Sequence, residues 1–264
     1  DKTRLEIGQI TLSDFSQSES SLAGAEAKNI KAINDFTTSK LNYENVIGKI
    51  DNIDNLNKSL NPISPLPQSL NEAIELSINN NPNIVIAKIE YEQSEKDIKI
   101  SKSDLAPTAT LSIERSNTED FSSTIDEKEQ DTIKATITWP FFSGGKNLAK
   151  INKNQSEKIR KRLLLDNTIK SNETSIASAW SNYQSSESIL KSIRAQVNAA
   201  EIANEGITEE YQRGSKSTLE FIQSTAILLD ARISLANSER DFVLAQYNLL
   251  KSIGLLNSDY LNVK

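Results

Sequence analysis

Apolar residues recur at helical spacing over most of the chain, and this pattern predicts long helices. The first helix is expected over residues 12–47, after a turn at Gly8 and with Gly48 at its end. A second helical region is expected over residues 69–105, broken where three asparagines precede Pro82. A long helical hairpin is expected over residues 146–253, with arms at 146–211 and 217–252, because proline is absent from both arms.

Between these helices the hydrophobic period changes from helical to alternating. Residues 107–115 and 131–139 each alternate apolar and hydroxyl-bearing or charged side chains, which predicts two strands of a hairpin spanning residues 107–142. Each strand has about the 9 to 11 residues that a tilted strand needs to cross a membrane. The acidic segment between them, residues 116–130, is expected to be a polar loop outside lipid.

The alternation alone leaves two readings of this hairpin open. A soluble hairpin with one face on a helical core would show the same pattern as a membrane hairpin. Trp139, Phe141 and Phe142 cluster at one end of the second strand, as aromatic residues do at a membrane interface, which favours the membrane. Gly144 and Gly145 follow directly and are expected to form the hinge from strand to helix.

The last predicted helix has two apolar stripes with a seven-residue repeat. One stripe includes Leu219, Ile233 and Tyr247, and the other includes Phe242 and Leu249. Two stripes indicate two neighbouring helices, which favours a closed ring or sheet of coiled-coil helices. A helix in a wide four-helix bundle is the alternative.

The chain also contains an internal repeat. Residues 5–50 align without gaps on residues 211–256, at the offset of 206 that separates Gly8 from Gly214. This repeat divides the chain into the end of a first repeat (1–48), a linker (49–67) and a second repeat (68–264). Because the second repeat has a long segment before its matching part, we expect the parent protein to continue N-terminally by a comparable length.

Composition narrows the function classes. The chain has no cysteine and no histidine, so thiol or imidazole catalysis and zinc sites of the usual kind are excluded. Its formal net charge is −6, and no basic stripe is present, which argues against a nucleic-acid partner. No motif organises the remaining polar residues into an active site. We therefore expect no enzyme activity, no cofactor and no metal.

Several motifs, taken in order, resemble the TolC family of outer-membrane efflux proteins. They are SLNEAIELSINNNPNI at 69–84, DLAP at 104–107, ITWPFFSGG at 137–145, YQRGSKSTLEFIQS at 211–224 and LLKSIGLL at 249–256. The resemblance implies a mainly α protomer whose coiled-coil helices carry membrane β-barrel strands. It also implies a homotrimer in the outer membrane of a Gram-negative bacterium, mostly periplasmic, with membrane lipid, a periplasmic adaptor and an inner-membrane transporter as partners.

The same resemblance implies where such a duct is gated. The turns Gly8 to Thr11 and Gly214 to Ser217 correspond to the periplasmic tips of the helical hairpins, where the family's tunnel narrows. Asp14 is implied opposite Tyr211 and Lys216 in a latch, and lysine in place of the family's arginine would make that latch weaker. Glu220 and Gln223 match the positions of a cation-binding constriction, although Gln223 carries no charge. Ordinary turn and solvated-helix roles are the alternative for these residues.

A soluble coiled-coil protein, such as a periplasmic adaptor, is the main rival from another class. It would explain the seven-residue repeats without a membrane. It would not explain the 206-residue repeat or a single strand pair set between long helices. The sequence therefore favours a passive export duct of a tripartite efflux or type I secretion system.

Overall fold

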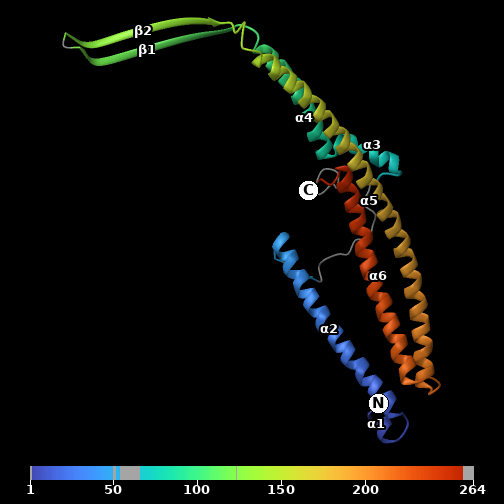
Figure 1. The fold of residues 1–264 in the computed structure, drawn as a ribbon. Coiled ribbons are helices and arrows are strands. Elements are labelled where there is room, and N and C mark those ends of the chain that lie inside the picture. Colours follow the sequence, from blue (N-terminus) through green and yellow to red (C-terminus); the bar gives the residue numbers. More distant parts are fainter. Residues whose placement is uncertain (1, 50–51, 54–65, 123, 258–264) are drawn as a thin grey trace. The chain divides into compact units, whose positions relative to one another are not determined.

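The computed structural model describes residues 2–49, 52–53, 66–122 and 124–257 and is mainly α-helical (Figure 1). A single antiparallel strand pair interrupts the helices in this described part, which confirms the predicted fold class. None of the described helices is both long enough and apolar enough to cross a membrane. Most of the predicted linker at 49–67 lies outside the described residues. The elements are α1 (Lys2–Glu6), α2 (Leu12–Val46), α3 (Leu70–Asn80), α4 (Pro82–Ser103), β1 (Thr108–Ser122), β2 (Ile125–Thr138), α5 (Lys146–Gln212) and α6 (Thr218–Ile253).

The helices begin and end at capping and helix-breaking residues of the sequence. The Ser69 side chain accepts a hydrogen bond from the Glu72 backbone at the start of α3, as expected of an N-cap. The Glu72 carboxylate, however, accepts from the Gln68 N–H rather than from the cap residue itself. The 67 residues of α5 make a rod of about 100 Å at 1.5 Å per residue.

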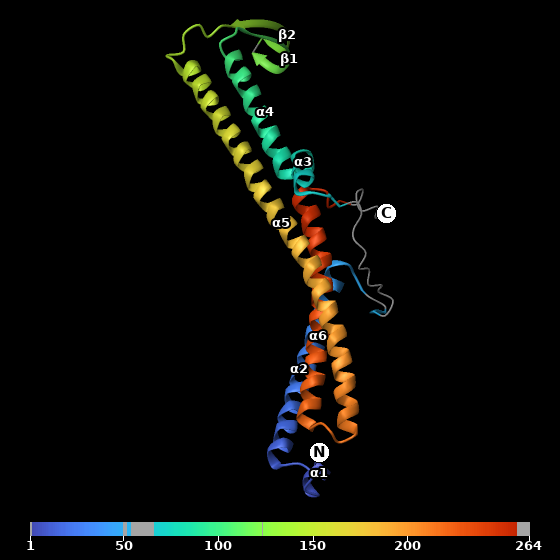
Figure 2. The same cartoon turned by 90° about the vertical axis from the view of Figure 1, so that its right-hand side faces the viewer.

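The chain divides into two compact units, one of which comprises residues 67–177 and 252–257. In this unit α4 runs antiparallel along the first part of α5 (Figure 2). Ion pairs Lys161–Glu90 (2.7 Å) and Lys158–Glu95 (2.6 Å) link the two helices. Because these pairs are exposed to solvent that screens them, their main effect is to fix the register of the two helices.

A polar corner in the same unit joins the ends of several helices. Asn81 is almost fully buried between α3 and α4, and its side-chain amide donates to the Asn172 side chain and to the Ser252 carbonyl, both at 2.8 Å. Asn172 in turn donates to the Ser77 hydroxyl at 2.9 Å. Gly254, with φ of +90°, packs directly against the Asn80 backbone. The corner therefore fixes the end of α6 to the α3–α4 junction.

The other unit contains α1, α2, the part of α5 from Ser178 and α6 up to Lys251. Phe242 and Leu249 are buried there, and the Phe242 ring stacks on Tyr183 of α5 at 6.0 Å. The predicted stripe through these two residues is thus the one that packs on α5. Ile233 and Tyr247 of the other stripe are exposed.

The hairpin is longer than the sequence analysis predicted. Its register runs from Thr108 opposite Thr138 to Glu119 opposite Glu127, with a shift beyond Glu119. The expectation of a polar loop over residues 116–130 was therefore wrong. The charged and amide side chains in this region pair across the strands: Arg115 lies 3.5 Å from Asp131, and Asn117 donates to Glu127 at 2.8 Å. Such cross-strand pairs allow the ladder to continue.

Candidate functional site

The two predicted hairpin tips have the same backbone geometry. Gly8 and Gly214 have φ of +73° and +80°, which favours glycine. The glycine N–H donates to the carbonyl three residues before it, and the next N–H donates to the carbonyl five residues before its own position. This is the Schellman pattern that ends a helix, with the same hydrogen bonds at both tips.

Each tip is followed by a capping box that starts the next helix. At the first tip the Asp14 N–H donates to the Thr11 hydroxyl at 3.1 Å, and the Thr11 N–H donates to the Asp14 carboxylate at 3.2 Å. At the second tip Ser217 and Glu220 exchange the same two bonds at 3.2 and 3.0 Å. The acidic residues therefore fix the direction in which α2 and α6 leave the tips.

The structure gives the implied latch residues different partners. Asp14 is bonded within its own turn, to Thr11, and not to Tyr211 or Lys216. Lys216 donates instead to Glu220 at 2.8 Å, four residues further along the chain. Gln223 is exposed one turn beyond Glu220. The polar groups of Asp14 and Lys216, which the resemblance implied would link the two tips, are thus engaged in hydrogen bonds within their own turns.

A different residue, Arg4 of α1, connects the tips. Its guanidinium Nη1 donates to the Tyr211 hydroxyl at 2.9 Å and to the Thr218 hydroxyl at 3.4 Å. The guanidinium carbon also lies 5.5 Å from the centre of the Tyr211 ring, within the range of a cation–π contact. Tyr211 stacks in turn on Phe221, with ring centres 4.9 Å apart. The sequence analysis missed Arg4, which precedes the aligned repeat.

The Glu220 carboxyl is strongly biased toward its ionised form. Hydrogen bonds from Lys216 and from the backbone and hydroxyl of Ser217 lower the pKa of Glu220 to about 2 from its usual 4.5. Because the ionised form is favoured in the folded protein, this contribution to stability is complete above about pH 4.5 and is lost as the pH falls toward 2.

We expect Glu220→Gln to lower the thermal unfolding temperature at neutral pH, because glutamine cannot accept the same charge-assisted bonds. The difference from the wild type should shrink between about pH 4.5 and pH 2, where Glu220 becomes protonated. Calorimetry over this pH range measures it. In Lys216→Ala the unfolding temperature should begin to fall at a higher pH than in the wild type, because Glu220 loses one of its hydrogen-bond donors. A difference in unfolding temperature between the wild type and Glu220→Gln that does not change with pH would contradict this assignment.

The hairpin has two chemically distinct faces. Leu111, Ile113, Ile133 and Ile137 lie on one face and are 67–77% exposed. The opposite face of the same segment carries hydroxyl groups at Thr108, Thr110, Ser112, Thr132, Thr136 and Thr138. The apolar face ends where Arg115 lies opposite Asp131. This alternation gives a short band suited to lipid on one side and to water on the other.

Aromatic residues and a pair of glycines follow the apolar band. Phe141 and Phe142 are 87% and 82% exposed, and the Trp139 indole N–H donates to the Leu105 carbonyl at 3.2 Å. Gly144 and Gly145 both have positive φ, +58° and +84°, just before α5 begins. Two successive residues with positive φ are readily accommodated by glycine, which has no Cβ.

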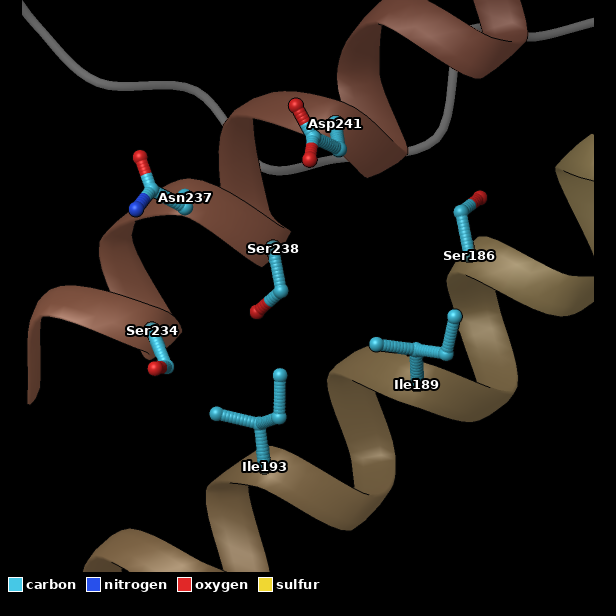
Figure 3. Close-up of a pocket in the computed structure, with 7 residues that line it drawn as sticks. All are labelled: Ser186, Ile189, Ile193, Ser234, Asn237, Ser238 and Asp241. Carbon is cyan, nitrogen blue, oxygen red and sulfur yellow. The ribbon is translucent and has the colours of Figure 1, made fainter. Parts of the chain in front are cut away.

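A shallow groove of about 240 Å³ lies between α5 and α6 (Figure 3). Its serine hydroxyls donate to carbonyls of their own helices, Ser186 to Tyr183 and Ser234 to Asp230, both at 2.8 Å. They are therefore already engaged, and the groove is a packing gap between small side chains. Its lining residues are Ser186, Ile189, Ile193, Ser234, Asn237, Ser238 and Asp241.

Long antiparallel helices joined to a two-faced β-hairpin define the class of fold. The sequence profile described as outer membrane efflux protein matches residues 73–255, so the chain belongs to that family. This membership agrees with the resemblance found in the sequence and assigns the protein to the outer membrane of a Gram-negative bacterium.

Individual relatives agree with this assignment. The chain is 26% identical over 267 residues to the outer membrane efflux protein BepC of Brucella suis, covering all of this chain and 57% of the relative. It is 21% identical to the outer membrane protein TolC of Vibrio cholerae, covering 97% of this chain and 60% of the relative. A crystal structure of a membrane protein from Pseudomonas aeruginosa has the same fold, with a TM-score of 0.76 at 18% identity over 96% of this chain and 59% of that one. The chain thus spans under two thirds of the length of these proteins.

Proposed function

We propose that the chain is part of a passive export duct in the outer membrane, the channel component of a tripartite efflux or type I secretion system. The two-faced hairpin carries this proposal, because it continues directly into the 67-residue helix α5. A soluble hairpin would gain by covering four large apolar side chains that are exposed here. Conduction of this kind needs no catalytic residue and no cofactor.

In the proposed duct the hairpin forms part of a closed barrel wall. The Leu111 face lies against lipid, the Thr110 face lines the lumen, and Trp139, Phe141 and Phe142 sit at the periplasmic interface. The hairpin supplies two strands, and both of its edges need neighbours, because unpaired backbone groups are not tolerated in lipid. Three copies, each with a second hairpin outside this chain, would close the wall as a homotrimer.

We place the gate at the tips formed around Gly8 and Gly214. The Arg4–Tyr211 contact supports this assignment, because it ties the end of one repeat to the start of the tip of the other. Tyr211, Lys216, Glu220 and Gln223 would surround the entrance, with Asp14 and Glu220 holding the helix starts. A periplasmic adaptor and an inner-membrane transporter would engage this end.

The proposed constriction differs in charge from a bare carboxylate ring. Each Glu220 carboxylate is held by Lys216 at 2.8 Å, so three symmetric copies would present compensated charges when the ion pairs are intact. Cation binding by this ring would therefore require Lys216 to move away. Gln223 would add only neutral amide groups one turn further along the helix.

Single-channel conductance across a planar bilayer, measured on the full-length protein that also carries the second hairpin, tests the duct and its gate together. Arg4→Ala removes the contacts to Tyr211 and Thr218 and should raise the open population about fivefold, because a charge-assisted bond at a partly exposed site contributes about 1 kcal/mol. Tyr211→Phe keeps the ring stacked on Phe221 and should have a smaller effect in the same direction.

The control for this test is Arg213→Ala, because Arg213, just after α5, pairs locally with Glu209 at 3.0 Å, four residues before it. It should leave the conductance unchanged. A protein that never enters the bilayer would overturn the duct and favour a soluble adaptor. Equal conductance in the wild type, Arg4→Ala and Tyr211→Phe would contradict a role of Arg4 in the gate.

A further inference from the structure

One cation interrupts the hydroxyl face of the hairpin within the apolar band. Lys134 lies opposite Ser112 in the register, between Thr132 and Thr136 on the same face. Its sequence neighbours Ile133 and Ala135 point to the other face, with Ile133 74% exposed. Lys134 is therefore level with residues that suit lipid, although its own side chain points away from them.

This position fixes which side of the hairpin can face lipid. An ammonium directed into hydrocarbon is strongly disfavoured, whereas Leu111, Ile113 and Ile137 are favoured there. Both requirements are met only if the Lys134 face lines water. The assignment of the lumen side thus rests on a charge as well as on the hydroxyl groups.

The charge of Lys134 is not cancelled by a bonded partner. Among the residues that the structure describes, Lys134 makes no ion pair. The nearest carboxylate on its face, Glu114, is on the diagonal position of the partner strand, since Glu114 pairs with Thr132. Lys128 lies on the same face six residues away, beyond the apolar band.

We propose that Lys134 forms a cationic ring in the membrane section of the duct and makes that section prefer anionic solutes, those with carboxylate, phosphate or sulfate groups. The ring rests on the proposed function, because it requires three copies around one lumen. At the tips, by contrast, Lys216 compensates each Glu220 carboxylate.

The expected size of the effect follows from screened electrostatics. Compared with a neutral residue at position 134, three lysine charges about 10 Å from the axis raise the local concentration of a monovalent anion about fourfold at 0.01 M salt and less than about twofold at 0.15 M. Glu114 is present in both cases and does not change this ratio. For an anion with three or more charges this factor is raised to a power equal to the number of charges. A polyvalent anion is therefore the sensitive probe of the ring.

Inorganic tripolyphosphate, added to the hairpin side of single channels of the full-length protein, tests the ring without passing the tips. We expect it to interrupt the current of the wild type, and Lys134→Gln to weaken this block about fivefold at 0.15 M salt and more at 0.01 M. Arg115→Gln is the matched control, because it removes one cation from the opposite face of the same hairpin. It should leave the block unchanged.

The outcomes separate this inference from the proposed function. Channels that conduct normally but are blocked equally in the wild type and in Lys134→Gln would overturn the ring and leave the duct intact. A weaker block in both variants would also overturn it, because the effect would then not depend on the face. The absence of any current from the wild type would overturn the duct and the ring together.

Discussion

Replacing Gly254 by alanine is expected to destabilise the protein by about 2–4 kcal/mol. A Cβ at this position would lie 2.6 Å from the Asn80 carbonyl carbon, which belongs to the backbone and cannot rotate away. The φ of +90° adds strain for any residue with a side chain. The end of α6 would then have to leave the Asn81 corner, and thermal unfolding of the assembled protein would measure the loss.

Gly48 supplies the control, because it occupies the equivalent place in the repeat. It also has positive φ, +115°, but nothing lies within 4 Å of a Cβ built there. Gly48→Ala should therefore cost only the backbone strain, about 1 kcal/mol. Equal losses in the two variants would mean that the close contact with Asn80 contributes nothing.

Replacing Leu111 by arginine is expected to cost about 2–4 kcal/mol and to prevent stable insertion into the membrane. Leu111 is 67% exposed on the apolar face of the hairpin, which the proposed function places against lipid. Arginine at this depth must either enter hydrocarbon or distort the bilayer around it. Urea unfolding from phospholipid vesicles would give the free-energy difference.

Thr110→Arg is the matched control, since the neighbouring residue points to the opposite face. The same charge would then enter the lumen, where water solvates it, and the expected cost is below about 1 kcal/mol. If arginine were tolerated equally at positions 110 and 111, the two faces of the hairpin would not differ in environment. This result would contradict the proposal that one face lies against lipid.

Much of the helical architecture could be predicted from the sequence, because its boundaries are local. Gly214 marks the end of α5, and the capping box of Ser217 and Glu220 marks the start of α6, all within a few residues of the sequence. The asparagine corner could not be predicted in the same way. Asn172 lies in the middle of a polar helix, and only the folded chain brings it to Asn81.

The error in the hairpin has a related cause. Alternation of apolar and polar residues indicates which face of a strand is buried or lies in lipid. The alternation ends where both faces are exposed to water, even if the strand continues. The ladder itself depends on backbone hydrogen bonds and on cross-strand pairs such as Arg115 with Asp131. The end of the apolar pattern therefore marked the edge of the band, whereas the strands continue past it to Ser122 and Ile125.

The tip residues illustrate a limit of reasoning from resemblance. Asp14 and Lys216 were implied to meet across the tips, but each has an acceptor or donor three or four residues away that it reaches without ordering a second segment. Short-range partners of this kind carry a smaller entropy cost than distant ones. Arg4, in contrast, bonds to a residue that is distant in the sequence, the Tyr211 hydroxyl.

The two-stranded sheet has a consequence for how the protein reaches its membrane. Each strand of the hairpin has one partnered edge and one open edge, so a single copy entering lipid would carry two rows of unpaired backbone groups. Entry and association must then happen in the same kinetic event. The rate of insertion should accordingly rise more steeply than linearly with protein concentration. At low concentration the chain should remain adsorbed on the membrane surface without inserting.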